Sequence, residues 1–224
     1  IGSELVPALR QRFGDENVVA AGHETPIPDD MKAAGPFAYV DVTDYDQVDA
    51  AMREHGVDTL FHLSSILSAL AEQVRPRAWA VNFDGLFNVL EAAVANGLDR
   101  VIVPSSIAAF GPGTPLDNTP NDTVQKPNTL YGISKVFTEL MGNYYQSKLD
   151  LDVRGVRLPG IISWKIEPTA GTTDYAVAIF YGAIRENRYT CFLRPDSRLP
   201  MMYMPDAIRA LTNLAAADIN GLNH

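Results

Sequence analysis

The amino-acid sequence predicts an α/β fold in which helices cover both faces of a parallel β-sheet. Short apolar runs alternate along the chain with stretches of helical length, an order typical of βαβ units. The run Val101-Ile102-Val103 is apolar at every position, as expected of a strand covered on both sides. With 224 residues, of which 46% are hydrophobic, the chain suffices for one sizeable core. We therefore expect a Rossmann-like, doubly wound sheet.

The elements follow from local patterns in chain order. Leu5, Leu9 and Phe13 recur at helical spacing and indicate a helix near the start of the chain. A second, well-marked helix ends at Asn96-Gly97. The expected strands are 17–21, 38–42, 59–63, 101–105, 153–158 and 189–193. The expected helices are 3–13, 45–55, 79–96, 130–148, 175–186 and 205–217.

Composition excludes several classes of protein. Lys and Arg number 18 against 27 Asp and Glu, and the resulting net charge of −9 repels nucleic acid and anionic membranes. No apolar run is long enough to span a bilayer. The single cysteine, Cys191, rules out an internal disulfide and a cysteine-based zinc site, and we predict no metal. Cys191 is expected to be buried in an apolar strand, with a catalytic thiol as the alternative.

Ligands of such folds bind beyond the carboxyl ends of the strands. Polar or flexible residues follow the expected strands there: Ser64-Ser65, Pro104-Ser105-Ser106 and Pro159-Gly160. The irregular stretches 111–128 and 163–174 are rich in Gly, Pro, Thr and Asn, and we expect them to be binding loops.

Tyr131 and Lys135 form the pair of residues that indicates chemistry. Four residues apart on an expected helix, they lie on one face, where an ammonium group favours the phenolate. Tyr131 would then be a general base, and a hydroxyl of Ser105-Ser106 could bind the same substrate oxygen. The alternatives are an exposed helix face for the pair and a strand-end turn for the serines.

Taken together, these segments resemble the extended short-chain dehydrogenase/reductase superfamily. Within it they are most similar to the L-threonine 3-dehydrogenases. The likeness runs over nearly the whole chain and rests on residues 58–69, 81–88, 104–112, 157–163, 171–181 and 199–207. The last two segments favour the threonine dehydrogenases over nucleotide-sugar epimerases and dehydratases.

The resemblance implies roles for individual residues. Tyr131 would be the general base, Lys135 would lower its pKa and hold the cofactor ribose, and Ser106 would orient the substrate hydroxyl. Implied cofactor contacts are Gly2, Asp41, Val42, His62, Leu63, Ser64, Asn82, Ser105, Tyr131, Lys135, Pro159 and Ile161. Implied substrate contacts are Ser68, Ser106, Tyr131, Thr172 and Thr173.

The implied activity is NAD-dependent oxidation of the L-threonine side-chain hydroxyl to 2-amino-3-oxobutanoate. Residues 1–160 would form the dinucleotide-binding domain, and residues 161–224 a substrate-binding portion interleaved with the sheet. The resemblance further implies a cytoplasmic homodimer.

The sequence departs from the family pattern in two places. The family opens with a strand and a Gly-x-x-Gly-x-x-Gly turn that approaches the pyrophosphate. Here Ile1-Gly2 looks like the end of that turn, so we expect the first strand and the earlier glycines to be absent. After the 17–21 strand, Gly22-His23-Glu24 replaces the usual acidic residue at the adenosine ribose, which leaves NADP open beside NAD.

Two other functions remain open at this stage. A nucleotide-sugar epimerase or related reductase would need a larger pocket and cations for a diphosphate, for which Lys165, Arg185, Arg188 and Arg194 are the candidates. A nicotinamide-binding protein without turnover would not need Ser106, Tyr131 and Lys135 together, although the missing glycine loop favours it.

Overall fold

The computed structural model describes residues 1–24, 26–165, 167 and 173–222. Its helices are α1 (Gly2–Phe13), α2 (Asp29–Ala33), α3 (Tyr45–His55), α4 (Ser68–Gln73), α5 (Arg75–Trp79), α6 (Gly85–Ala95), α7 (Leu130–Leu149), α8 (Tyr175–Glu186) and α9 (Met204–Ala216). A π-helical turn, η2 (Ala80–Asp84), joins α5 to α6. Short 3-10 turns are η1 (Asp15–Asn17), η3 (Ile107–Ala109) and η4 (Ile219–Gly221).

The strands are β1 (Ala20–Gly22), β2 (Phe37–Tyr39), β3 (Thr59–Phe61), β4 (Arg100–Ile102), β5 (Ser105–Ser106), β6 (Asp152–Arg154), β7 (Arg157–Leu158), β8 (Gly160–Ile162) and β9 (Met201–Tyr203). Every pairing between them is parallel: β1 with β2, β3-β4-β6 in that order, β5 with β7, and β8 with β9. The predicted parallel α/β arrangement is confirmed.

The β5–β7 ladder continues the β4–β6 ladder. The Val103 amide donates to the Arg154 carbonyl at 2.8 Å, and the Ser105 amide donates to the Val156 carbonyl at 2.9 Å. Pro104 has no N–H to donate, so it interrupts the strand between these two bonds. The sheet is thereby extended to the serine pair.

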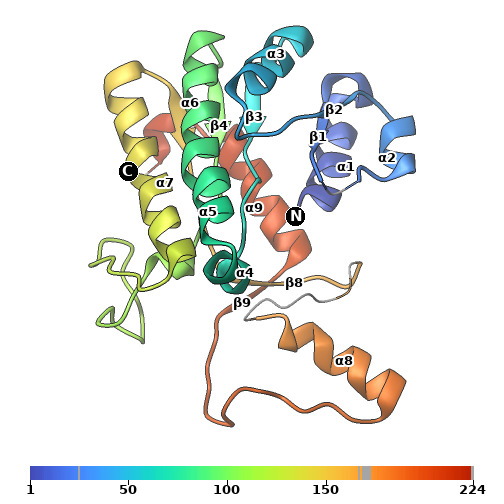
Figure 1. Ribbon diagram of the computed structural model, residues 1–224, viewed down its shortest axis with the longest axis vertical. Coiled ribbons are helices and arrows are strands. Elements are labelled where there is room, and N and C mark those ends of the chain that lie inside the picture. Colours follow the sequence, from blue (N-terminus) through green and yellow to red (C-terminus); the bar gives the residue numbers. More distant parts are fainter. Residues whose placement is uncertain (25, 166, 168–172, 223–224) are drawn as a thin grey trace.

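Two hydrophobic cores lie on opposite sides of β4. Val101 and Val103 pack with residues of α3, α6 and α7, whereas Ile102 packs with residues of α1 and α9. Successive side chains of a strand point to opposite faces, so β4 serves both cores. In Figure 1, α3, α6 and α7 accordingly stand on one side of the strands, and α9 passes behind them. This is the doubly wound arrangement that the sequence predicts.

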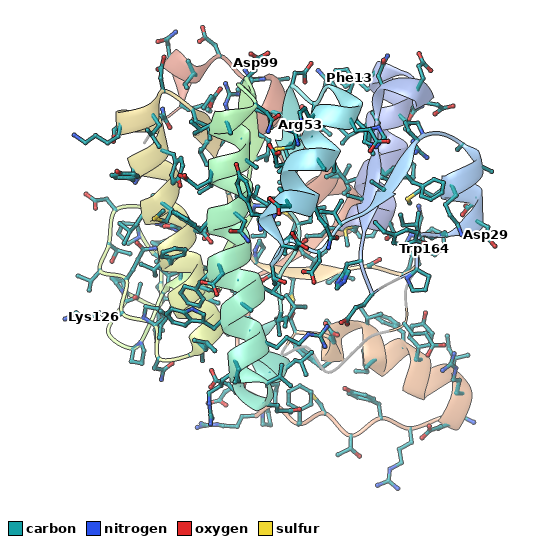
Figure 2. The ribbon with its side chains drawn as sticks, turned by 45° about the horizontal axis from the view of Figure 1, so that its top comes forward. Phe13, Asp29, Arg53, Asp99, Lys126 and Trp164 are labelled. Atoms are coloured by element: carbon teal, nitrogen blue, oxygen red, sulfur yellow. The ribbon has the colours of Figure 1, made fainter. Side chains whose placement is uncertain are left out.

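The orientation of the strands places their carboxyl ends toward α8. Phe13 ends α1, Arg53 lies in the last turn of α3 and Asp99 precedes β4. Figure 2 shows these three residues together at the end of the molecule away from α8. The amino end of β4 therefore lies there, and the segments after the strands face the end where α8 stands, beyond β8 and β9 (Figure 1).

Capping residues explain why α3 and α7 begin where they do. Asp44 accepts hydrogen bonds from the amides of Asp46 and Gln47 at the start of α3. Thr129 accepts one from the Gly132 amide at 3.0 Å, which fixes the first turn of α7. Tyr131 belongs to that turn, so a threonine cap positions the predicted base.

One predicted strand is wrong and two observed strands are missing from the prediction. Residues 189–193 form no strand, and Cys191 is exposed rather than buried. The aromatic ring of Phe192 instead contacts Tyr175 of α8 edge-on, with ring centres 6.2 Å apart. Strands β8 and β9 exist because they pair with each other, in the register Gly160 to Met201, across some forty residues of chain.

None of the described helices combines the length and the hydropathy that a membrane crossing requires.

Candidate functional site

Tyr131 and Lys135 lie on the same face of α7, as the sequence predicts. The Nζ atom of Lys135 is 5.2 Å from the centre of the Tyr131 ring. Both residues lie near the helix start, where α7 packs on β5 and on the η3 turn. The serine pair and the tyrosine–lysine pair, about 25 residues apart in sequence, are thereby brought together.

Lys135 is a buried amine held by the backbone. Its side chain is 9% exposed, and Nζ donates a hydrogen bond to the Pro104 carbonyl at 3.1 Å. Burial lowers the pKa of Lys135 from 10.5 to about 8, because the charged form loses its hydration. One ammonium N–H is used on Pro104, which leaves two donors for a ligand.

Tyr131 differs from expectation in its ionisation. Burial raises the pKa of the Tyr131 phenol above its ordinary value of 10, and a hydrogen bond with the Ser106 side chain lowers it only in part. The expected lowering by Lys135 is not found, because burial disfavours the phenolate more than its neighbours favour it. In the protein alone, Tyr131 is therefore protonated at neutral pH.

The two serines of β5 have different partners. The Ser106 hydroxyl lies beside the Tyr131 phenol and lowers its pKa, and the Ser106 Oγ accepts a hydrogen bond of 3.2 Å from the Ala108 amide. Ser105 donates to the Glu139 carboxylate at 2.5 Å. Ser106 thus faces the phenol as predicted, while the Ser105 hydroxyl is engaged by α7, and its contact with a cofactor stays a prediction.

His62 follows β3 directly and lies beside Lys135. Its amide donates to the Ile102 carbonyl at 2.9 Å, which extends the β3–β4 ladder. Burial, together with the positive charge of Lys135, lowers the pKa of His62 from 6.5 to about 4. The imidazole is neutral at physiological pH, so it presents no charge to a ligand.

Asn82, in the π-helical turn η2, fixes the segment after β3. Its side chain accepts from the Ile66 amide at 2.7 Å and donates to the Ile66 carbonyl at 2.9 Å. It also reaches the Ser134 hydroxyl of α7, at 3.4 Å. Asn82 therefore connects the Ser64–Leu67 segment to α7, and its predicted contact with a cofactor stays a prediction.

The residues at the ends of β1 and β2 form a charged group. The Asp41 carboxylate accepts from the amide and hydroxyl of Thr43 at 2.9 and 2.8 Å, and His23 lies 3.6 Å from it. Glu24 forms an ion pair with Arg77 of α5. Next to Asp41, the Val42 carbonyl accepts a hydrogen bond from the Asn88 side chain of α6.

The remaining predicted residues lie around the carboxyl ends of the strands. Leu63 and Ile161 pack against the core under α1 and α9, Ser64 is exposed, Pro159 precedes β8 and Ser68 begins α4. A Cβ built on Gly2 would lie 3.6 Å from Leu63, and one built on Gly160 would lie 2.6 Å from Thr173. Thr172 lies outside the described residues.

These residues fit a dinucleotide cofactor. Gly2 opens α1, and the amide groups at a helix start favour a phosphate. The remaining N–H donors of Lys135 suit ribose hydroxyls. The neutral His62 and the exposed Ser64 follow strand β3. Among the described residues, no three His, Cys, Asp or Glu side chains gather as metal ligands.

One cavity lies away from these residues. Its volume is about 350 Å³, and it is lined by residues of α8 and of the segment after it: Ala178, Gly182, Glu186, Arg188, Tyr189 and Thr190. None of these residues belongs to the predicted site.

Sequence reasoning missed Glu139 and Arg157. The Arg157 Nε and Nη2 atoms donate to the two Glu139 oxygens at 2.8 and 2.7 Å, and Ser105 shares one of those oxygens. The available signal was the spacing: residues 131, 135 and 139 succeed one another by four and share a helix face.

Comparison with known proteins identifies the family of the chain. The model of the NAD dependent epimerase/dehydratase family matches residues 1–222. The chain is 45% identical over 223 residues to the mitochondrial L-threonine 3-dehydrogenase of Bos taurus, covering 100% of the chain and 59% of the bovine protein. It therefore spans less than two thirds of that relative.

Solved structures agree with this match. The holo form of an L-threonine dehydrogenase from Cupriavidus necator superposes with a TM-score of 0.95 at 45% identity, covering 100% of this chain and 72% of that one. A monomeric L-threonine 3-dehydrogenase of metagenomic origin superposes with a TM-score of 0.94 at 39% identity, covering 100% and 71%. By sequence and by structure, the chain belongs to the NAD-dependent epimerase/dehydratase family.

Proposed function

We propose that the chain is the catalytic part of an NAD-dependent L-threonine 3-dehydrogenase. The reaction is oxidation of the substrate side-chain hydroxyl to give 2-amino-3-oxobutanoate. The observation that carries the proposal is the group of Tyr131, Ser106 and Lys135, in which the Ser106 hydroxyl lies beside the Tyr131 phenol and the Lys135 amine lies over the ring. The 45% identity with an enzyme of that name supports it.

In this mechanism Tyr131 takes the proton of the substrate hydroxyl. Ser106, beside the phenol, would orient that hydroxyl toward the Tyr131 oxygen. When bound, NAD would supply the acceptor for the hydride that leaves the same carbon. Lys135 would hold the ribose with its remaining N–H groups and stabilise the negative charge that develops beside it.

The raised pKa of Tyr131 has a direct consequence for this reaction. Because the phenol is protonated in the protein alone, its activation depends on positive charge brought to the site. We infer that the complex with the oxidised cofactor, and not the free protein, holds the ionised base.

We propose that residues 161–224 supply the substrate-binding portion, while residues 1–160 bind the cofactor. Thr173 lies against Gly160 of β8, and Ser68 opens α4 near the start of α7. Together with Thr172, these hydroxyls suit a zwitterionic amino acid, because they pair with both of its charges without a net charge of their own.

We propose NAD over NADP as the cofactor. The carboxylates of Asp41 and Glu24 lie at the ends of β2 and β1, where they would repel an added 2′-phosphate. Arg77 offsets Glu24, which keeps NADP as the second candidate. Fluorescence titration with both reduced cofactors decides between them, and tighter binding of NADPH would reverse the assignment.

We propose a homodimer formed through α6 and α7. Apolar side chains of both helices are exposed: Phe87 and Val94 on α6, and Ile133, Leu140 and Tyr144 on α7. Helices α6 and α7 contact each other, and apolar side chains exposed on neighbouring helices suit an interaction surface. Light scattering of the purified protein measures the mass, and a monomer, the state of one solved relative, would contradict the proposal. A cytoplasmic location stays a prediction.

The deciding experiment is a substrate panel read at the absorbance of reduced nicotinamide. We expect L-threonine with NAD to give a rising signal and UDP-glucose to give none. Turnover of a UDP-sugar without L-threonine oxidation would favour an epimerase or reductase. Tight NAD binding with no turnover of any substrate would favour a cofactor-binding protein without catalysis.

A further inference from the structure

Glu139 lies on the same face of α7 as Tyr131 and Lys135, and the reaction described above does not use it. We propose that Glu139 is a positioning residue, which holds β5 and the 111–128 loop so that Ser106 meets the Tyr131 phenol. The proposal rests on the proposed function only for the role of Ser106 in the reaction. The contacts that support it do not depend on any substrate.

Three side chains of α7 hold three consecutive residues of the strand end. Lys135 binds the carbonyl of residue 104, Glu139 binds the Ser105 hydroxyl, and the Tyr131 phenol lies beside the Ser106 hydroxyl. Two of these contacts belong to groups that would react or bind cofactor. The Ser105–Glu139 bond lies between the other two along the strand, and the proposed proton transfer uses neither of its side chains. Its effect on the reaction is therefore confined to where the strand lies.

Glu139 also joins β5 to its neighbour. Ser105 pairs in register with Arg157 of β7, and Arg157 donates two hydrogen bonds to Glu139 at 2.8 and 2.7 Å. The carboxylate thus bridges side chains from two adjacent strands, and this planar, two-bond geometry restricts orientation as well as distance. A change at Glu139 would release both strands at once.

The same group anchors the loop that precedes α7. Gln125 donates to the second Glu139 oxygen at 2.8 Å, and Arg157 Nη1 donates to the Asn121 carbonyl at 2.7 Å. The guanidinium group of Arg157 also lies 5.0 Å from the centre of the Phe110 ring, at the start of that loop. Loop 111–128 is therefore tied to α7 at both its ends through Glu139 and Arg157.

The negative charge of the Glu139 carboxylate stabilises this arrangement. Burial alone would raise the pKa of Glu139, but hydrogen bonds from Arg157, Ser105 and Gln125 hold it below the ordinary value. The carboxylate stays ionised at neutral pH and accepts from all three partners. An amide in its place would present a donor to Arg157 and break at least one of these bonds.

The test compares three variants of the full chain saturated with NAD. Ser105→Ala removes one hydroxyl and leaves the Glu139–Arg157 pair intact, and Glu139→Gln removes the charge. Asp152→Asn is the matched control, because Asp152 is also a partly buried carboxylate bound by two arginines, Arg100 and Arg154, away from the site. Steady-state kinetics with L-threonine gives kcat and KM separately, and hydrogen–deuterium exchange reports on residues 104–127.

We expect kcat to fall roughly 10- to 100-fold in Glu139→Gln and less in Ser105→Ala, with KM changed by no more than about twofold. Exchange at residues 104–110 and 120–127 should rise in both variants. Asp152→Asn should unfold more easily than the unmodified protein but keep its kcat. A Ser105→Ala variant with unchanged kcat and unchanged exchange would overturn the proposal, as would equal loss of kcat in Asp152→Asn.

Failure of the proposed function is distinguishable from failure of this proposal. If the unmodified protein does not oxidise L-threonine, the function is wrong, and exchange alone then decides whether Glu139 holds the strand and loop. Exchange in Ser105→Ala and Glu139→Gln that matches the unmodified protein would reject the positioning role whatever the substrate. Should Glu139→Gln fail to fold, Ser105→Ala still gives both readouts, because it removes no charge.

Discussion

The Nζ atom of Lys135 lies 5.2 Å from the centre of the Tyr131 ring and donates its hydrogen bond to the Pro104 carbonyl rather than to the phenol. The lysine is thus fixed beside the base without neutralising it. Burial of the amine lowers its pKa, because the charged form loses its hydration, and this burial carries a cost in stability. That cost can be measured.

Replacement of Lys135 by Met should stabilise the protein while abolishing oxidation of L-threonine. The pKa of Lys135 falls from 10.5 to about 8 on folding, so the charged form is disfavoured in the folded state by about 3 kcal/mol. Below pH 8 both states are protonated and the full penalty applies. Between pH 8 and 10.5 the folded protein binds fewer protons, and the penalty disappears as pH rises.

Urea unfolding at pH 7 and at pH 10.5 checks this. At pH 7 the free energy of unfolding of the Lys135→Met variant should exceed that of the unmodified protein. The difference between the two should shrink toward zero at the higher pH. An unmodified protein that is the more stable of the two at pH 7 would show that the Pro104 hydrogen bond outweighs the burial of the charge.

Replacement of Tyr131 by Phe should abolish turnover and leave the cofactor bound. Only the phenol oxygen is lost, and the ring keeps its place over the Lys135 amine. We expect kcat to fall by roughly 100-fold or more, as for removal of a general base. Titration of the intrinsic fluorescence with NADH should give a dissociation constant within about threefold of the unmodified value. Measurable turnover at the original rate would remove Tyr131 from the mechanism.

The buried imidazole of His62 should make the protein sensitive to acid. Its pKa is lowered on folding from 6.5 to about 4, so the unfolded chain binds the proton more readily. The stability that the neutral imidazole contributes is complete above pH 6.5 and is lost as pH falls from 6.5 to 4, by about 3 kcal/mol.

Denaturation curves at pH 7.5, 6, 5 and 4.5 should therefore separate the unmodified protein from His62→Asn. The unmodified protein loses stability faster over this window, because the asparagine binds no proton. Parallel losses in the two proteins would mean that His62 is not the group responsible.

Replacement of Asn82 by Ala should loosen the segment after β3. The Ile66 amide and carbonyl both lose their side-chain partner, at a cost of about 1–3 kcal/mol. Since Ser64 belongs to the same segment, we expect weaker NADH binding as well as easier unfolding. Asn96→Ala is the control, because Asn96 bonds to Asp49 and Ala92 at the far end of α6. Equal effects of both variants on NADH affinity would contradict the role of Asn82.

Sequence alone predicts the elements that carry their own signals. Helices α3 and α8 begin and end at the predicted residues, because α3 has an Asp cap and a glycine stop and both have amphipathic patterns. The Tyr131–Lys135 face also follows from spacing within one helix. Such features depend on neighbours a few residues away, and those neighbours are readable in the sequence.

Features that depend on distant partners are not readable in this way. Strands β8 and β9 stabilise each other across a long intervening segment, whereas the apolar run at 189–193 pairs with no strand in the described part of the chain and stays irregular. The raised pKa of Tyr131 reflects the depth of burial, which composition does not encode. Glu139 likewise acquires its role only when residues 105 and 157 fold against it.

The wide turn at Ala80–Asp84 takes up one residue more than ordinary helical winding would. Removing one residue there would restore ordinary winding and leave the buried Leu86, Val89 and Leu90 close to their present places. The cost would fall on Asn82, whose side chain would leave its partner at Ile66. A one-codon deletion in this stretch would thus spare the core and be felt in the segment after β3, where the cofactor is proposed to bind.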